Sequence, residues 1–165
     1  MIISIKEIRN FLISILIPLL VGYCSSVIAN LLSGLDVSTY YSQLIKPGFA
    51  PPGYIFPIVW TILYTLMGIS SYIVMKKGYD LYKVKDAMFF YWLQLILNFM
   101  WSILFFGLDL RFTSLIVIII LLVIVLIMIF KFYKINKVAA YINIPYILWL
   151  IYALFLSYFI WIINK

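Results

Sequence analysis

The sequence predicts an all-α membrane protein, a five-transmembrane-helix bundle with a long, ordered loop between helices 1 and 2. The first observation is a series of five apolar runs that contain no Asp, Glu, Lys or Arg. Each run has about the 20 residues that carry a helix across the hydrocarbon core. The second observation is the composition, because 67% hydrophobic and 10% charged residues exceed what a soluble domain of this size can bury.

The five runs fill most of the 165 residues and leave no room for a soluble catalytic module. Helices are expected throughout, since lipid offers no partner for a free backbone N–H or C=O. We therefore expect residues 1–165 to form one domain. The predicted spans are Phe11–Leu32, Tyr54–Met75, Ala87–Phe106, Phe112–Phe130 and Val138–Ile163.

The first span begins near Lys6 and Arg9, which resemble the start of a secretory signal peptide. The sequence Val27–Ala29 is a poor cleavage site, however, and the apolar run continues past it, so the span is expected to be retained. Small polar residues recur every four positions in this span. That stripe, which is predicted to pack closely against another helix, consists of Gly22, Ser26 and Asn30.

The first gap, residues 33–53, is the longest and is rich in aromatic side chains. Asp36 and Ser38 are suited to cap a short helix over Tyr40–Ile45, which Lys46 and Pro47 would end. Two interpretations are open. The aromatic residues could form an interfacial belt of the kind common in membrane proteins. Alternatively, the gap could form a lid over a cavity between the helices, because long ordered loops are usually functional.

The second and third spans carry the polar residues that most need partners. Thr61, Thr65 and Gly68 predict a second packing face. Gln94 and Asn98 are four residues apart and share a face of the third helix, where Trp101 follows one turn later. Amides within hydrocarbon are expected to face protein or a ligand.

The fourth and fifth spans differ in how regular they are. The fourth is rich in Ile, Leu and Val and offers no polar site. The fifth is interrupted by Asn143, Pro145, Tyr146 and Trp149. Pro145 removes one helical hydrogen bond and so frees the carbonyl of Tyr141, which then requires another donor.

The basic residues predict the orientation. Nine of them fall at the N-terminus and in the second and fourth gaps, whereas Lys46, Arg111 and Lys165 lie on the other side. The positive-inside rule then places the N-terminus in the cytoplasm and the C-terminus outside. The lysines lie scattered at helix ends, so no nucleic-acid partner is expected, and the lipid bilayer is the expected one. The high content of Ile and Lys suggests an AT-rich bacterium and therefore a bacterial cytoplasmic membrane.

Several kinds of chemistry are disfavoured by what the chain lacks. It has no histidine and one cysteine, Cys24, so it offers neither an imidazole base nor a zinc site, and no metal is expected. Its five acids lie in gaps or near helix ends, whereas an ion-driven pump needs one within the membrane. Hydrolase, metalloenzyme and ion-coupled transporter functions are therefore disfavoured.

The order of the remaining motifs resembles the TspO/MBR family, the translocator proteins or peripheral-type benzodiazepine receptors. The most specific match is Lys46–Gly53 followed by Pro57–Trp60. Leu63–Gly68 and Pro145–Trp149 also resemble the family, as do Gln94, Asn98 and Trp101. The resemblance covers nearly the whole chain.

This resemblance implies a five-helix bundle, a homodimer, and a cavity capped by the first loop. It implies porphyrin, haem-related tetrapyrrole, benzodiazepine or isoquinoline ligands, and light-dependent porphyrin breakdown at Trp60 and Trp149. The ligand-binding residues that it implies are Tyr41, Phe49, Pro51, Pro52, Trp60, Asn98, Trp101, Pro145, Tyr146, Trp149 and Ala153.

Two positions depart from the family pattern. Phe49 stands where members usually have tryptophan, which preserves an apolar plate but removes the indole N–H. The sterol motif is incomplete, because six residues separate Tyr158 from Lys165.

Helical rise places Trp60 about 9 Å and Trp149 about 16 Å into the membrane from opposite sides, so both are predicted to reach one zone.

The sequence therefore predicts a TspO-like tetrapyrrole-binding membrane protein. No tightly bound cofactor is expected, because haem would lack its commonest protein ligand, so porphyrin or haem is a ligand only. Any enzymatic activity is expected to be photo-oxidative. Two alternatives stay open: a transporter of small hydrophobic molecules, and a regulatory or structural membrane partner protein.

Overall fold

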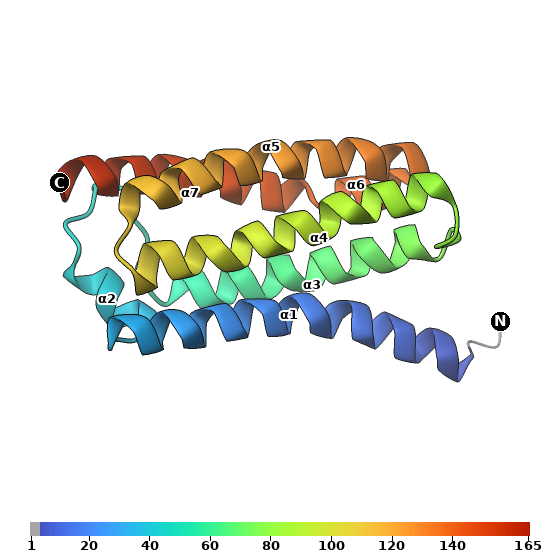
Figure 1. The fold of residues 1–165 in the computed structure, drawn as a ribbon, viewed down its shortest axis with the longest axis horizontal. Helices are drawn as coiled ribbons and strands as arrows, with labels where there is room; N and C mark the ends of the chain where they lie inside the picture. Colours follow the sequence, from blue (N-terminus) through green and yellow to red (C-terminus); the bar gives the residue numbers. More distant parts are fainter. Residues whose placement is uncertain (1–3) are drawn as a thin grey trace.

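A computed structural model describes residues 4–165, and helices account for most of that range, with no strand among its residues. Five helical segments are long and apolar enough to cross a membrane, which confirms the predicted fold class. Figure 1 shows them side by side as an elongated bundle. The elements are α1 (Ile5–Ser33), α2 (Val37–Gln43), α3 (Ile55–Met75), α4 (Tyr82–Ser102), the π-helical η1 (Ile103–Gly107), α5 (Arg111–Ile135), α6 (Lys137–Tyr141) and α7 (Ile144–Ile163).

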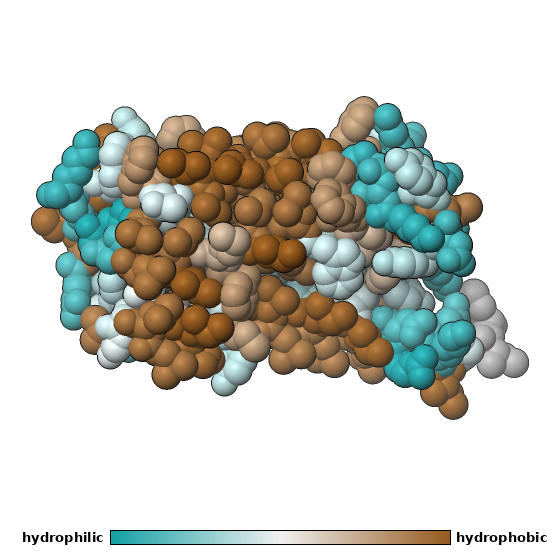
Figure 2. All heavy atoms as spheres, viewed as in Figure 1, coloured by the Kyte–Doolittle hydropathy of each residue, from teal (hydrophilic) through white to brown (hydrophobic). Residues whose placement is uncertain are grey.

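The surface agrees with a membrane setting. Figure 2 shows a broad hydrophobic belt around the middle of the bundle and hydrophilic residues at its two ends. Large aliphatic and aromatic side chains are exposed along all five spans, which in water would be an unusually large apolar area. The chain is therefore an integral membrane protein.

Glycine permits the closest approach between α1 and α3. A Cβ built on Gly68 would lie 2.5 Å from the Cα of Ile15 and 2.5 Å from the carbonyl oxygen of Ser14. A Cβ on Gly22 would lie 2.2 Å from the ring of Tyr64. The two helices thus touch near their middles, and in Figure 1 the first part of α1 diverges from the bundle.

The long first gap is ordered, as predicted, and contains the short helix α2. Asp36 is its N-cap, with the carboxylate accepting a 3.0 Å hydrogen bond from the Thr39 amide. The helix ends at Gln43, two residues before the predicted end, because the chain turns there into extended backbone at Leu44. The ammonium of Lys46 folds back and donates to the carbonyls of Tyr41, Ser42 and Leu44, each at 3.0 Å.

Two spans are less regular than the hydropathy pattern predicts. The third ends in the π-helical turn η1, which packs against α1. The fifth is divided into α6 and α7, since Pro145 occupies the first turn of a new helix that begins at Ile144. Asn143 lies between α6 and α7. Its side-chain amide donates to the Ala139 carbonyl of α6 at 2.8 Å and to the Ser70 hydroxyl of α3 at 2.7 Å.

Candidate functional site

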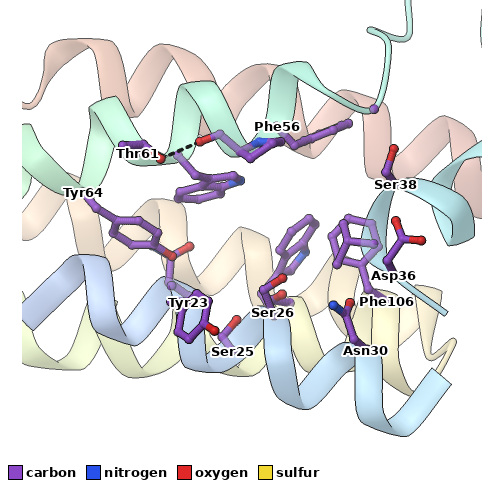
Figure 3. A pocket seen from close by; sticks show the side chains of 18 of the residues that line it. Tyr23, Ser25, Ser26, Asn30, Asp36, Ser38, Phe56, Thr61, Tyr64 and Phe106 are labelled. Carbon is purple, nitrogen blue, oxygen red and sulfur yellow. Dashed lines mark hydrogen bonds between the residues drawn. The ribbon is translucent and has the colours of Figure 1, made fainter. Parts of the chain in front are cut away.

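A cavity lies between α1, α3 and α4 and is closed at one end by α2. Its volume is about 560 Å³, within the roughly 300–1,000 Å³ range of small-molecule sites. Figure 3 shows the side chains of α1 facing those of α3 across the open space, with Asp36 and Ser38 at one end. The cavity therefore occupies the part of the α1–α3 pair between Tyr64 and the α2 end.

The α1 side of the cavity is polar. Ser25, Ser26 and Asn30 point towards it from successive turns of the helix (Figure 3). The stripe formed by Gly22, Ser26 and Asn30 is predicted from the sequence to pack closely against another helix. In the structure Gly22 packs against Tyr64 of α3, whereas Ser26 and Asn30 line the cavity. Thr61, also assigned to a packing face, lines the opposite wall and donates to the Pro57 carbonyl at 2.7 Å.

The α3 and α4 sides of the cavity are aromatic. Trp60 stacks on Tyr64 with ring centroids 5.2 Å apart and an interplanar angle of 28°. Trp101 stacks on Phe105 at 5.2 Å and meets Phe106 edge-on at 5.8 Å. Because Trp60, Trp101 and Phe106 all line the cavity, a flat apolar molecule would find aromatic plates on two of its walls.

Two polar atoms at the cavity lack hydrogen-bond partners. They are the Nε1 of Trp101, a donor, and the Oδ1 of Asn30, an acceptor, and both are buried. A buried polar group without a partner costs about 1–3 kcal/mol. A ligand with its own donors and acceptors would recover that cost, so the two atoms favour a ligand that is apolar over its face and polar at its edge.

A hydrogen-bonded cluster of three side chains fixes the deep part of the site. The Tyr146 hydroxyl donates to the Gln94 side-chain oxygen at 2.8 Å and accepts from the Asn98 amide. The Asn98 amide also lies 3.3 Å from the same Gln94 oxygen. All three side chains are buried, and of the three only Asn98 reaches the cavity. The two amides that sequence analysis expected to face protein or a ligand thus do so.

The first loop covers the end of the cavity that lies next to α2. Asp36, Val37, Ser38, Gly53 and Tyr54 contribute to the lining. Tyr41 is buried behind them, with its ring 4.8 Å from that of Phe56 in an edge-on contact. Of the two interpretations of this gap, the arrangement favours the lid.

A set of polar contacts, here called the latch, holds the loop against the ends of α5 and α7. The Tyr40 hydroxyl donates to the carboxylate of Asp109, which pairs with Arg111 at 2.7 Å. Arg111 also donates to the Asn164 carbonyl at 2.8 Å. The Asn164 side chain in turn binds the backbone of Ile45 twice, accepting from its N–H at 3.0 Å and donating to its carbonyl at 2.8 Å.

The latch changes the acid–base behaviour of Tyr40. Partial burial and the neighbouring Asp109 carboxylate raise the pKa of this phenol to about 12. At the mouth of the cavity, hydrogen bonds from the Thr39 hydroxyl and amide lower the pKa of Asp36. The loop therefore carries a neutral tyrosine and a charged aspartate at neutral pH.

Three of the predicted ligand-binding residues line the cavity: Trp60, Asn98 and Trp101. Trp149 lies behind Phe56, with ring centroids 6.0 Å apart, and its indole N–H is buried without a partner. Phe56 therefore lies between Trp149 and the cavity, whereas Trp60 lines the cavity directly. Tyr146 contacts Trp60 edge-on at 6.4 Å and belongs to the cluster below the cavity.

The other predicted residues do not line the cavity. Phe49 is half-exposed and packs on Tyr152 and Phe159 of α7, at 6.3 and 5.5 Å. Ala153 is buried within α7, whereas Pro145 is exposed where that helix begins. Tyr41, Pro51 and Pro52 belong to the loop that covers the site.

Sequence reasoning missed most of the α1 wall and part of α3. The missed lining residues include Tyr23, Ser25, Phe56 and Tyr64. The polar stripe on α1 could have indicated that this side of the helix lines a cavity. Asn30 is larger than the small residues that a close contact between helices requires.

Comparison with known proteins is consistent with this architecture. The model of the TspO/MBR family matches residues 14–162. A tryptophan-rich protein TspO from Archaeoglobus fulgidus is 37% identical over 158 residues, covering 96% of this chain and 99% of that protein. The same-named protein from Chlorobaculum tepidum is 31% identical over 159 residues, with 96% and 98% coverage. A human translocator protein is 31% identical over 123 residues, covering 74% of this chain and 73% of its own length.

Proposed function

The chain belongs to the TspO/MBR family of integral membrane proteins, and we propose that it binds a porphyrin or related tetrapyrrole in the cavity between α1, α3 and α4. The observation that carries the proposal is the asymmetry of this cavity. Trp60, Trp101 and Phe106 offer aromatic plates, whereas Ser25, Ser26 and Asn30 offer polar groups. A porphyrin is a flat, largely apolar ring with carboxylates at one edge, which matches both kinds of wall.

The unpartnered atoms support an orientation for the ligand. The Trp101 N–H can donate to a ligand oxygen, and the Asn30 oxygen can accept from a ligand N–H or O–H. The aromatic rings of Trp60 and Phe56 then contact the ring face. The same cavity would take benzodiazepine- or isoquinoline-type molecules, which are also flat, apolar and equipped with few polar atoms.

We further propose that Trp60 supports light-dependent breakdown of the bound porphyrin. Its indole lines the cavity and stacks on Tyr64, so an oxidisable ring lies beside the ligand. Excited porphyrin can take one electron from this indole, and molecular oxygen, the oxidant, can then add to the resulting porphyrin radical anion. Return of the electron to the oxidised indole leaves a cyclic peroxide on the porphyrin, which opens to two carbonyl groups and so breaks the tetrapyrrole ring. The side chain supplies the electron, and neither an acid nor a base is needed.

A titration of purified protein with protoporphyrin IX, followed by quenching of tryptophan fluorescence, tests the binding proposal. Wild type is expected to give saturable quenching by one porphyrin per chain. Ser26→Phe places a ring inside the cavity and is expected to weaken binding at least about tenfold, because the ligand must overcome packing strain of about 1–3 kcal/mol. Leu20→Phe is the matched control, since Leu20 lies on the exposed side of α1.

Equal binding by the Ser26→Phe and Leu20→Phe proteins would place the porphyrin elsewhere and refute the proposed site. Absence of saturable quenching in wild type would refute porphyrin binding altogether. Protein-dependent movement of porphyrin across the membrane of sealed vesicles would instead favour a transporter.

A further inference from the structure

A second cavity, here called the inner cleft, lies along the same pair of helices at the opposite end from α2. Its volume is about 410 Å³, and it is bounded by the first part of α1, the last part of α3 and the middle of α4. The contact of Gly68 with Ser14 and Ile15 lies between the two cavities along α3. The inner cleft is therefore distinct from the proposed porphyrin site.

The shape of the cleft follows from the divergence of α1. Pro18 lacks an amide hydrogen and allows the helix to bend near the Gly68 contact, and Figure 1 shows the N-terminal part of α1 leaning away from α3. Along α1 the lining runs from Ile17 to Glu7, which spans about 15 Å at 1.5 Å per residue. That depth is close to the roughly 15 Å thickness of one leaflet's hydrocarbon.

The lining of the cleft is mostly apolar, with the small polar side chains of Ser14 and Ser71 at its deep end and charged side chains at its mouth. Ile13 and Trp92 are partly exposed and line its sides together with Met75. At its mouth the Lys76 ammonium lies 2.9 Å from the Glu7 carboxylate, and the two side chains are 56% and 39% exposed. An amphipathic molecule with a long apolar chain and a charged head fits this gradient.

The charge around the mouth determines the sign of that head. Nine of the 12 basic residues lie at this end of the bundle, against three of the five acidic ones. Of those three, Glu7 is already paired with Lys76, and Asp86 with Lys131. The remaining positive field attracts anionic lipid headgroups.

We propose that the inner cleft holds one phospholipid with an anionic headgroup. Its phosphate contacts Lys76 beside Glu7, and an acyl chain lies between α1 and α3 against Ile13 and Trp92. A soluble anion would use the lysine but not the apolar sides, which extend towards Gly68. This site is independent of the porphyrin proposal, since it shares no lining residue with the first cavity.

The test is a lipid titration of the full chain in a non-ionic detergent, with bound lipid counted by native mass spectrometry. The first phosphatidylglycerol is expected to bind about fivefold more tightly than the first phosphatidylcholine, the scale of one basic residue acting on an anionic headgroup. Lys76→Gln is expected to remove that preference. Ile13→Trp, which narrows the cleft from its exposed side, is expected to weaken binding of both lipids.

The matched control is Lys134→Gln, because Lys134 lies at the same end but over the ring of Phe130, at 4.3 Å. It should keep the preference for phosphatidylglycerol. If Lys76→Gln and Lys134→Gln reduce the preference for phosphatidylglycerol equally, the preference arises from the overall positive charge at this end of the bundle, and the proposed site is overturned. No preference in wild type, or unchanged binding by Ile13→Trp, would overturn it as well, and so would displacement of the lipid by glycerol phosphate alone.

Discussion

Trp60 and Trp149 have different surroundings, although the family resemblance gives them one role. Trp60 lines the cavity, whereas Phe56 stands between Trp149 and the open space. Electron transfer from an indole falls off with distance from the excited ring. If the cavity holds the porphyrin as proposed, we therefore expect the main photochemical contact at Trp60.

We expect Trp60→Phe to slow light-driven loss of the porphyrin absorption band several-fold more than Trp149→Phe does. Phenylalanine preserves an aromatic plate, so porphyrin binding should be retained in both variants. The measurement is the bleaching rate of bound protoporphyrin IX under fixed illumination in air. Equal slowing by the two substitutions would contradict the assignment, and bleaching at wild-type rate in the double variant would exclude both residues.

At the scale of single residues, the sequence predicted Trp60, Asn98 and Trp101 well and the α1 wall poorly. The three correct residues stand out because an indole or an amide within an apolar span needs a partner. Ser26 and Thr61 are small, and a small residue is equally suited to helix packing and to lining a cavity. Only the position of the neighbouring helix decides between these roles.

The loop that covers the cavity is expected to respond to pH through Tyr40. Its fold favours the neutral form of Tyr40, since the pKa is raised to about 12 from 10.0. The stability that this tyrosine contributes is therefore complete below pH 10 and is lost as the pH rises from 10 to about 12. Above that range a phenolate faces the carboxylate of Asp109, although Arg111 offsets part of the repulsion.

We expect the loop to open across that pH range, and limited proteolysis around Pro47 and Gly48 should report the opening. A difference titration of tyrosinate absorbance between wild type and Tyr40→Phe isolates this one group among the 14 tyrosines. Titration of the difference signal near pH 10, with no added cleavage by pH 12, would show that the latch does not hold the loop.

The contact between α1 and α3 depends on the absence of a side chain at Gly68. A Cβ there meets the backbone of both Ser14 and Ile15, which cannot rotate away. Gly68→Leu is expected to destabilise the protein by about 1–3 kcal/mol through overpacking. Thermal unfolding in detergent measures the change.

Gly48 provides the control, because a Cβ at that position meets no atom within 4 Å. Gly48→Ala should leave the midpoint of unfolding nearly unchanged. A Gly68→Leu protein as stable as wild type would mean that α1 and α3 separate easily, and the division between the two cavities would then lack support.

At the scale of elements, hydropathy predicted the five spans but not their irregularities. The capped helix α2 follows from local rules of capping and proline placement, whereas the sequence left open whether its loop forms an interfacial belt or a lid. The break between α6 and α7 has a local cause in Pro145, and the Asn143 amide adds a distant partner, Ser70. The π-helical turn η1 packs against α1, which is distant in the sequence. An apolar average over 20 residues carries no information about such partners.

The orientation of the whole molecule is predicted from the distribution of charge. With Cys24→Ser as background, an impermeant thiol reagent applied to intact cells is expected to modify Lys165→Cys and to spare Lys77→Cys. The two sites lie at opposite ends of the bundle (Figure 1), so each serves as the other's control. The reverse pattern of labelling would overturn the orientation without affecting the fold.

The two cavities lie towards opposite ends of the bundle, and we propose that the one beneath α2 holds a tetrapyrrole. The most direct measurement is an experimental structure of the full chain with protoporphyrin IX. We expect the ring between Trp60 and Trp101 beneath α2, with polar contacts to the Trp101 N–H and to Asn30. A ring found in the inner cleft or on the lipid-facing surface, with the cavity beneath α2 empty, would contradict the account.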